Sequence, residues 1–246
     1  MIFTEKVKIP LKDVEQGNVI SDRGILEIFE NVATHHSDSL HDGVSEIKEK
    51  GQAWVIMDWK VKILSRPKYG GEFKINTWSR ENNIQVRKIA TYRDFEMYDE
   101  QGNLCVIATS KWVVINIQTG RLTNIDMELQ QRYEPEEKSV FGLWDIEKSI
   151  QGKDVLNEVE YTVARNDVDF NKHMHNIYYM NLAYNALPED VYNSRPFNTF
   201  KITYKREIKL GDTVKCKYTK DGLNHVVTVY NQDETKVHSI ITLSNE

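Results

Sequence analysis

Apolar and polar positions along this 246-residue chain follow two different periods. After a short β-like stretch at residues 4–10, apolar residues recur every three or four positions from Asp22, which predicts an amphipathic helix. Its apolar face consists of Ile25, Leu26, Ile28, Phe29, Val32 and Ala33. From residue 53 the period falls to two, which is typical of β-structure. Strands are predicted at 54–64, 72–79, 84–98 and 104–117.

The same order of one helix followed by strands returns in the second half of the chain. A short strand is predicted at 161–164, a helix at 176–187, and further strands at 200–208, 213–218, 223–230 and 236–243. The strands that contain Trp59 and Phe200 match at an offset of 141 residues, and the helices align at an offset of 152. Two copies of a helix with antiparallel strands predict a duplicated α+β unit.

Two polar stretches interrupt this pattern. Residues 35–52 are predicted to form a long connection, and residues 121–158 lack a regular period. The second stretch contains a charged run that disfavours regular structure, EPEEK at residues 134–138, and apolar residues that predict contact with another part of the chain: Phe141, Leu143 and Trp144. We therefore expect an N-terminal repeat at 1–121, a connector at 122–158 and a C-terminal repeat at 159–246.

Composition restricts the class of protein. A content of 40% hydrophobic and 28% charged residues is typical of a globular protein, and a net charge of −5 argues against nucleic acid as the main partner. The sequence has no apolar run of membrane-spanning length and no signal-peptide pattern at its start. Cys105 and Cys216 are the only cysteines, which favours a reducing compartment. We expect a cytoplasmic protein with no membrane insertion.

Three histidines lie close together at the end of the first predicted helix: His35, His36 and His41. No carboxylate or cysteine accompanies them at a spacing typical of metal ligands. We therefore predict a solvated helix end rather than a metal site, and we expect no metal and no cofactor.

Residues 167–176 concentrate polar side chains directly before the second helix: two Asp, two Asn and two His. Free N–H groups at a helix start can hold a developing negative charge, which is what the attack on a carbonyl requires. Taken singly, Asp169 and Asn171 are ordinary turn residues. Polar groups that converge at one place instead predict a functional site.

Residues 167–179, DVDFNKHMHNIYY, resemble the D-x-D-x-N-x-H-x-N-N-x-x-Y pattern of the acyl-acyl-carrier-protein thioesterases. Two further matches follow in the family's order: ATSKWVVIN at 108–116 with TGRL at 119–122, and YKRE at 204–207. The resemblance implies an α+β double hotdog, in which two tandem hotdog repeats each pack a long helix on an antiparallel sheet.

The resemblance also implies an enzyme of fatty acid biosynthesis that hydrolyses fatty acyl-acyl-carrier-protein to free fatty acid and carrier protein. Its implied catalytic residues are Asp169, Asn171, His173 and Glu207. The family pattern has been interpreted with a nucleophilic cysteine directly after the Arg-Glu pair, but that position is Ile208 here. We therefore predict that water attacks the thioester carbonyl directly.

Each of these residues has a predicted role in that attack. Glu207 is the general base, assisted by His173, because an imidazole transfers protons readily near neutral pH. Asn171 orients the water or donates to the carbonyl, and Asp169 fixes His173 or its loop. Backbone N–H groups near His175 and Asn176 complete the oxyanion site.

Two features depart from the family pattern or complicate it. His175 occupies a position where the family has Asn. Strict alternation from Phe200 also places Glu207 on the same strand face as Lys201 and Lys205, where a solvated carboxylate is the ordinary interpretation. A bulge or a covering segment would be needed to place Glu207 in a site.

The offsets predict that the second half carries the chemistry. They align Asn171 and His173 with Val19 and Ser21, and Glu207 with Arg66, so the first half lacks the polar set. The first half is then expected to complete the sheet and line the acyl pocket, as the resemblance also implies.

The sequence leaves the docking surface, the substrate and the oligomeric state open. Residues 201–220 carry seven basic residues, and the implied carrier protein is acidic, so the segment is either a docking surface or a solvated strand face. An acyl-coenzyme A thioesterase and a non-catalytic acyl-binding hotdog protein are the alternative functions. Both a monomer and a homodimer are compatible with the sequence.

Overall fold

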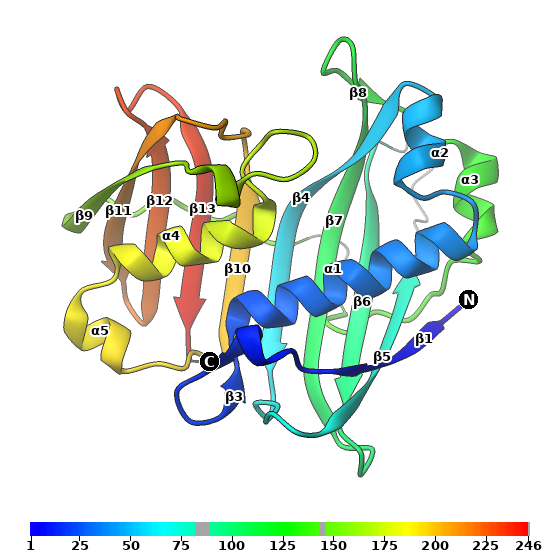
Figure 1. Ribbon diagram of the computed structural model, residues 1–246, viewed down its shortest axis with the longest axis horizontal. Coiled ribbons are helices and arrows are strands. Elements are labelled where there is room, and N and C mark those ends of the chain that lie inside the picture. The colour runs from blue at the N-terminus through cyan, green and yellow to red at the C-terminus, as the bar shows by residue number, and fades with distance from the viewer. Residues whose placement is uncertain (82–88, 143–145, 246) are drawn as a thin grey trace. The chain divides into compact units, whose positions relative to one another are not determined.

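The computed structural model describes residues 1–81, 89–142 and 146–245, and the chain divides into two compact units, Met1–Ile146 and Glu147–Glu246. Each unit packs a helix on an antiparallel sheet (Figure 1). The predicted duplication of an α+β unit is therefore confirmed. The unit boundary falls inside the stretch predicted as a connector: residues 122–146 belong to the first unit and 147–158 to the second.

The first unit is built around one long helix. Its helices are α1 (Asp22–Ser39), α2 (Val44–Glu49) and α3 (Met127–Arg132), with a 3₁₀ turn η1 (Leu11–Asp13). Its strands are β1 (Phe3–Lys8), β2 (Val14–Glu15), β3 (Val19–Ile20), β4 (Gln52–Ile63), β5 (Glu72–Ser79), β6 (Thr91–Tyr98), β7 (Leu104–Asn116) and β8 (Leu122–Thr123). The sheet order is β1-β5-β6-β7-β4 with β8 on β7, while β2 and β3 form a separate hairpin.

The second unit repeats this plan with a shorter helix. Its helices are α4 (Tyr179–Ala186) and α5 (Glu189–Asn193), with 3₁₀ turns η2 (Arg165–Asp167) and η3 (Asn176–Tyr178). Its strands are β9 (Val155–Thr162), β10 (Thr199–Tyr204), β11 (Thr213–Asp221), β12 (Asn224–Asn231) and β13 (Val237–Ser244), in the order β10-β13-β12-β11-β9. α4 lies across the face of this sheet (Figure 1).

The apolar face predicted for the first helix forms the core of the first unit. Ser21 caps α1 by accepting a hydrogen bond from Gly24 N at 3.0 Å. All six predicted face residues are buried. Beneath the helix, the ring of Phe29 stacks 4.8 Å from that of Phe95, which in turn lies 5.3 Å from Trp59. Aromatic burial of this kind contributes several kcal/mol to stability, by comparison with typical core truncations of about 3–5 kcal/mol.

The prediction of a long connection at residues 35–52 is wrong. α1 continues to Ser39, and α2 lies within the same stretch. His36 is fully buried: its ring stacks on Phe3 at 5.0 Å, and its Nδ1 lies 2.9 Å from Nη1 of Arg93. Burial and the Arg93 charge lower the pKa of His36 to about 3. The predicted solvated helix end is thus wrong for His36, because tertiary contacts cover this end of the helix.

No group of three potential metal-ligating side chains lies together in the described residues. His35, one of the three histidines considered as ligands, instead pairs with Glu5 at 2.8 Å.

Several predicted strands have different bounds in the structure; β11, predicted at 213–218, for example continues to Asp221. β6 begins at Thr91, and part of the strand predicted at 84–98 lies outside the described residues, as do Leu143 and Trp144. The strand predicted at 161–164 begins earlier, at Val155. The strand predicted at 72–79 has those bounds in β5.

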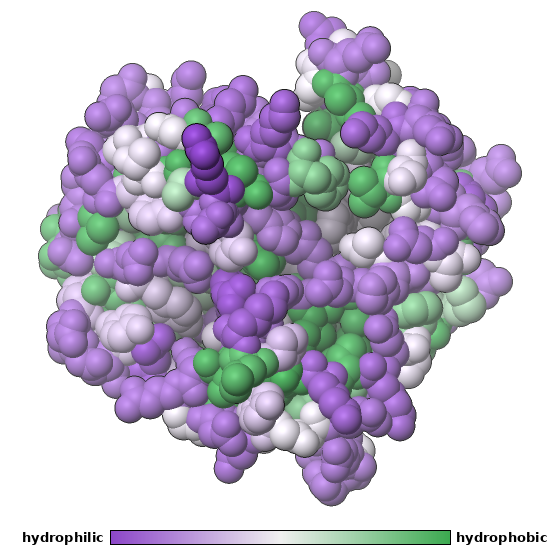
Figure 2. Space-filling view, viewed as in Figure 1, coloured by the Kyte–Doolittle hydropathy of each residue, from purple (hydrophilic) through white to green (hydrophobic). Residues whose placement is uncertain are grey.

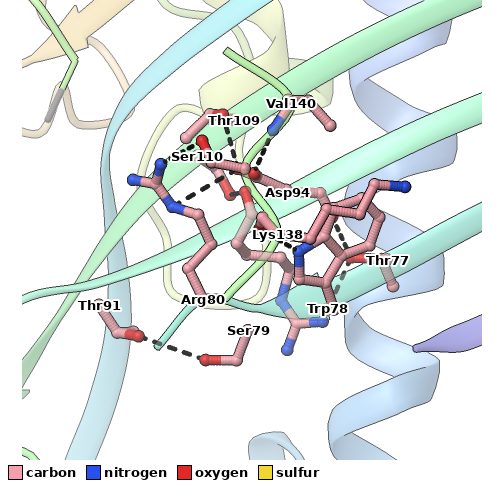
Figure 3. A network of polar contacts seen from close by, with 12 residues as sticks. Thr77, Trp78, Ser79, Arg80, Thr91, Asp94, Thr109, Ser110, Lys138 and Val140 are labelled. Carbon is pink, nitrogen blue, oxygen red and sulfur yellow. Dashed lines mark hydrogen bonds and ion pairs between the residues drawn. The ribbon is translucent and has the colours of Figure 1, made fainter. Parts of the chain in front are cut away.

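Residues 136–141 cross the sheet of the first unit as a strap (Figure 3). Lys138 O accepts from Trp78 Nε1 at 2.9 Å, and Val140 N donates to Asp94 Oδ2 at 2.9 Å. Thr109 donates to the other oxygen of Asp94 at 2.6 Å, and Arg80 Nε lies 3.7 Å from that oxygen. The predicted contact of this segment with another part of the chain is therefore confirmed for its described residues.

Figure 2 shows a mainly hydrophilic surface on the side of the helices, with scattered hydrophobic patches. No helix of the described chain is both long and apolar enough to cross a membrane.

Candidate active site

A tight hairpin turn presents the polar run of the second unit. Val168 and Met174 form an antiparallel bridge across the turn. Asp169 N donates to His173 O at 2.9 Å, and Lys172 N donates to Asp169 O at 3.0 Å. Lys172 has a φ of 66°, which is the left-handed conformation that closes the turn. The backbone thus fixes the position from which the His173 side chain projects.

The Asp169 carboxylate holds this turn from inside. Its Oδ1 accepts from the backbone N–H of Asn171 at 2.8 Å and of His173 at 3.3 Å. The Asn171 amide Nδ2 lies 3.4 Å from Asp169 Oδ2. The hydrogen bonds between Asp169 and His173 therefore involve the backbone of His173.

Glu207 lies in a loop rather than in a strand. β10 ends at Tyr204, so the alternation that set Glu207 beside Lys201 does not extend to it. The loop is held from one side by His238, whose carbonyl accepts from Lys205 N at 2.8 Å and Arg206 N at 3.2 Å. The strand predicted at 200–208 is therefore too long by four residues.

Two backbone contacts join the Glu207 loop to the hairpin. His173 forms an antiparallel bridge with Lys209, and Met174 N donates to Ile208 O at 2.8 Å. Both Met174 and Ile208 are buried, so this junction is anchored in the core. Residues that are 34 and 36 positions apart in the sequence are thereby held in a fixed register.

The junction brings His173 and Glu207 together. His173 Nε2 lies 3.3 Å from Glu207 Oε2, and Lys209 Nζ lies 3.5 Å from the other oxygen, Oε1. The side chains of His173 and Glu207 are 33% and 55% exposed, so water reaches both. An imidazole and a carboxylate in contact at the surface can accept a proton from water and return it.

Tyr179 supports the Glu207 loop from below, and sequence reasoning did not single it out. Its hydroxyl donates to Arg206 O at 3.4 Å, and its ring meets that of Tyr204 edge-on at 5.2 Å. Burial, followed by the nearby Glu207 charge, raises the pKa of Tyr179. The sequence did carry a signal for this residue, because Tyr179 is the tyrosine that ends the D-x-D-x-N-x-H-x-N-N-x-x-Y pattern, but no role was predicted for it.

The start of the second helix differs from the prediction. The N–H of His175 donates to Asp167 O at 2.8 Å, so its predicted availability for an oxyanion is wrong. Asn176 begins η3, and its side-chain Oδ1 is buried with no hydrogen-bond partner in the described chain. Tyr204 donates to the Asn176 carbonyl at 3.0 Å. The side chain of Asn176 thus keeps one buried acceptor atom without a partner in the described chain.

Neither cysteine is placed or poised as a nucleophile. Cys105 and Cys216 are both buried free thiols. Burial raises the pKa of Cys216 to about 12, which keeps it in the unreactive thiol form near neutral pH.

The first unit contains the same hairpin with different side chains. Val19 bridges Lys68 as His173 bridges Lys209, and Ser21 N donates to Asp13 O as His175 N donates to Asp167 O. These pairs align the hairpins and helix starts at an offset of 154 residues, whereas the bridged partners align at 141. The predicted helix offset of 152 is therefore wrong by two residues.

The corrected offset changes which residues correspond. His173 corresponds to Val19 and Asn171 to Gly17, while Glu207 still corresponds to Arg66. In the first unit, Arg66 Nη1 lies 2.8 Å from Asp22 and donates to Ile20 O at 2.9 Å. The first hairpin therefore carries a structural ion pair where the second carries an imidazole and a carboxylate.

The role of Asp169 can be separated from its charge. We expect Asp169→Ala to lower kcat about 100-fold, because the turn that positions His173 loses both hydrogen bonds to Oδ1. Asp169→Asn retains an acceptor oxygen and is expected to keep kcat within about fivefold of the unmodified protein. Steady-state hydrolysis of the thioester that the family resemblance implies as substrate measures both. Equal losses in the two variants would contradict a purely positioning role.

The two units match two parts of one family. Residues 1–133 match the acyl-ACP thioesterase N-terminal domain, and residues 150–245 match the acyl-ACP thioesterase C-terminal domain. The chain is 23% identical over 244 residues to the chloroplastic oleoyl-acyl carrier protein thioesterase 2 of Arabidopsis thaliana. That alignment covers 92% of this chain and 65% of the relative, so the chain spans just under two thirds of its length.

Solved structures share the whole fold. An acyl-ACP thioesterase from Bacteroides thetaiotaomicron superposes with a TM-score of 0.85 at 20% identity, covering 100% of this chain and 98% of the other. The 12:0-ACP thioesterase from Umbellularia californica superposes with a TM-score of 0.83 at 18% identity, covering 99% and 96%. At this level of identity the likeness concerns the fold, and it identifies the two helix-on-sheet units as a double hotdog.

Proposed function

Because the chain belongs to the acyl-ACP thioesterase family, we propose that it hydrolyses fatty acyl-acyl-carrier-protein to free fatty acid and carrier protein. The observation that carries this proposal is the contact of 3.3 Å between His173 Nε2 and Glu207 Oε2 on a surface that water reaches. Thioester hydrolysis needs a base beside the nucleophilic water and donors beside the carbonyl oxygen. The junction between the hairpin and the Glu207 loop supplies both kinds of group.

In the proposed reaction Glu207 takes a proton from water, directly or through His173. The hydroxide oxygen forms a bond to the thioester carbonyl carbon, and the carbonyl oxygen becomes an oxyanion. The carbon–sulfur bond then breaks, and the proton held by the His173–Glu207 pair passes to the leaving sulfur. The products are a fatty acid and the free thiol of the carrier protein, with no covalent bond to the enzyme.

The donors for the oxyanion are two side-chain amides in this proposal. Asn171 is exposed at the turn, and its Nδ2 has only a long contact of 3.4 Å to give up. Asn176 has no protein partner for its buried Oδ1, so its amide can rotate without breaking a bond at that oxygen. This assignment replaces the backbone N–H of His175, which is already bonded.

Water rather than a cysteine is the nucleophile. Ile208 occupies the position after Glu207, and it is buried with its carbonyl bonded to Met174. Cys216 lies within β11, is buried, and has a raised pKa. Both observations support an attack that involves no enzyme thiol.

The function is tested by the products formed from matched thioesters. Dodecanoyl, palmitoyl and oleoyl groups, the acyl chains in the names of curated relatives, are loaded on carrier protein and on coenzyme A. We expect release of free fatty acid and thiol with a higher kcat/KM for at least one carrier-protein ester than for its coenzyme A ester. A preference for coenzyme A throughout would assign the alternative substrate. Binding of acyl groups without turnover would overturn the enzymatic function.

A further inference from the structure

The seven basic residues at 201–220 do not form one surface. Lys217 lies 2.5 Å from Glu234 and 3.4 Å from Glu158, and Lys215 lies 3.0 Å from Glu234. Lys201 is mostly covered and lies 3.6 Å from Glu147. These lysines are neutralised within the second unit, so the segment as a whole is not the docking surface that its composition suggested.

Of the other four basic residues, Lys220 lies near the end of β11, and the remaining three lie on the loop that carries Glu207. Lys205 and Arg206 are exposed in the loop directly before Glu207, and Lys209 lies directly beyond it. The hairpin adds Lys172, which is exposed in the turn that carries His173. The turn at 169–173 and the loop at 205–210 together carry four basic residues against two carboxylates, Asp169 and Glu207, which gives them a net positive charge in a chain of net charge −5.

Two apolar side chains stand exposed on the same two segments. Phe170, at the tip of the hairpin, is 69% exposed, and Leu210, after the bridge of His173 with Lys209, is 50% exposed. A large aromatic side chain at this exposure contributes little to its own fold, whereas buried aromatic and aliphatic anchors dominate binding interfaces. Cations with apolar anchors suit an acidic protein surface that also presents apolar side chains.

The first unit shows that the scaffold does not require these residues. At the offsets fixed by the equivalent bridges, Phe170 corresponds to Gln16 and Lys172 to Asn18. In the loop, Lys205 corresponds to Leu64 and Arg206 to Ser65, while Lys209 corresponds to Lys68. The same turn and loop therefore fold in the first unit with two basic residues, Arg66 and Lys68, where the second unit has four. The first turn has no aromatic residue, and Tyr69 stands in the first loop where the second has Leu210.

We propose that the turn at 169–173 and the loop at 205–210 form the surface on which the acidic acyl carrier protein docks. This inference rests on the proposed function and names the surface through which its substrate is delivered. Docking there places the thioester at the end of the carrier's arm next to His173 and Glu207. The charges steer the encounter and the apolar side chains hold the complex.

Two variants test the surface without touching the catalytic pair. Lys172→Glu combined with Lys205→Glu reverses two charges, and Phe170→Ser removes the apolar anchor. Lys68→Glu combined with Lys236→Glu is the matched control, because it changes the net charge equally at exposed lysines outside the surface. Each variant is assayed with an acyl-carrier-protein ester, the acyl-coenzyme A ester and the acyl-pantetheine ester, which lacks both protein and nucleotide.

The charge reversal is expected to raise KM for the carrier-protein ester about tenfold at low ionic strength with little change in kcat. The difference shrinks at high salt, because exposed charges are screened. Phe170→Ser is expected to raise the same KM about tenfold at both ionic strengths. Hydrolysis of the pantetheine ester stays unchanged in both variants, and the control behaves as the unmodified protein.

Several results would contradict the proposal that the turn and the loop form the docking surface. An unchanged KM for the carrier-protein ester, or an equal rise in the control, would place docking elsewhere. An equal loss with the pantetheine ester would mean that the substitutions damage the site itself. A rise in KM for the acyl-coenzyme A ester, with no rise for the carrier-protein ester, would mean that the surface binds nucleotide phosphates. If the unmodified protein did not hydrolyse the carrier-protein ester at all, the result would refute the proposed function instead.

Discussion

Replacing Glu207 by glutamine is expected to lower kcat for acyl-carrier-protein hydrolysis by about 100- to 10,000-fold, the usual contribution of a general base. Glutamine keeps the shape of the side chain and its distance to His173, but its amide cannot accept the proton of the attacking water. KM is expected to remain within about threefold, since binding of the substrate does not require the charge of Glu207. The comparison is made by steady-state hydrolysis of one carrier-protein ester.

The matched control for this variant is Glu234→Gln, which also removes one carboxylate charge from the second unit. Glu234 is exposed in the turn between β12 and β13 and pairs with Lys215 and Lys217. Its substitution is expected to leave kcat unchanged. If Glu207→Gln retained more than about a third of the original kcat, the base would have to be His173 acting without Glu207.

The largest loss of stability is expected from Asp94→Ala in the first unit. Asp94 is fully buried, accepts hydrogen bonds from Thr109 and from the backbone of Val140, and lies 3.7 Å from Arg80 Nε. Burial raises the pKa of Asp94, while Arg80 partly offsets this effect. Removing the carboxylate from such a buried pair is expected to lower the free energy of unfolding by about 3–5 kcal/mol.

Urea unfolding followed by circular dichroism measures this loss. Asp94→Asn keeps one acceptor oxygen and is expected to lose less than Asp94→Ala. Asp99→Ala, at the exposed turn between β6 and β7, is the control, and its loss is expected to be much smaller. A loss for Asp94→Ala as small as that of the control would mean that the strap at 136–141 does not depend on this carboxylate.

The strands and the first helix were predictable because one face of each element is buried. β5 has the bounds predicted from its period of two, and the apolar face of α1 is buried at all six predicted positions. Polar segments were predicted poorly because they have no apolar face whose period reveals which side is buried. His36 lies in a polar stretch, and it is buried by contacts with Phe3, Arg93 and Tyr133, which are distant in the sequence.

The helix register was wrong by two residues because an apolar face matches another apolar face at more than one offset. The backbone bonds that remove this ambiguity, from Ser21 N to Asp13 O and from His175 N to Asp167 O, leave no trace in the pattern of hydrophobic residues. The same holds for the loop before Glu207, whose departure from the strand is fixed by the carbonyl of His238.

The polar run at 167–176 was visible in the sequence, but its arrangement was not. The structure brings His173 and Glu207 into contact, places Asn171 against Asp169, and directs Asp169 to backbone N–H groups. The supporting contact of Tyr179 with the Glu207 loop depends on which helix position faces that loop. A helical period gives the apolar face but not the partner of each residue on it.

The central claim is that the His173–Glu207 pair activates water, and a single turnover in water labelled with heavy oxygen tests it most directly. Enzyme in excess over an acyl-carrier-protein ester is allowed to react once, and mass spectrometry then measures the label in the fatty acid and in the peptide that contains Glu207. Direct attack predicts one labelled oxygen in every fatty acid released and none in Glu207. Label in the Glu207 carboxylate, or fatty acid released without label, would contradict the account, because either result requires a covalent acyl-enzyme intermediate.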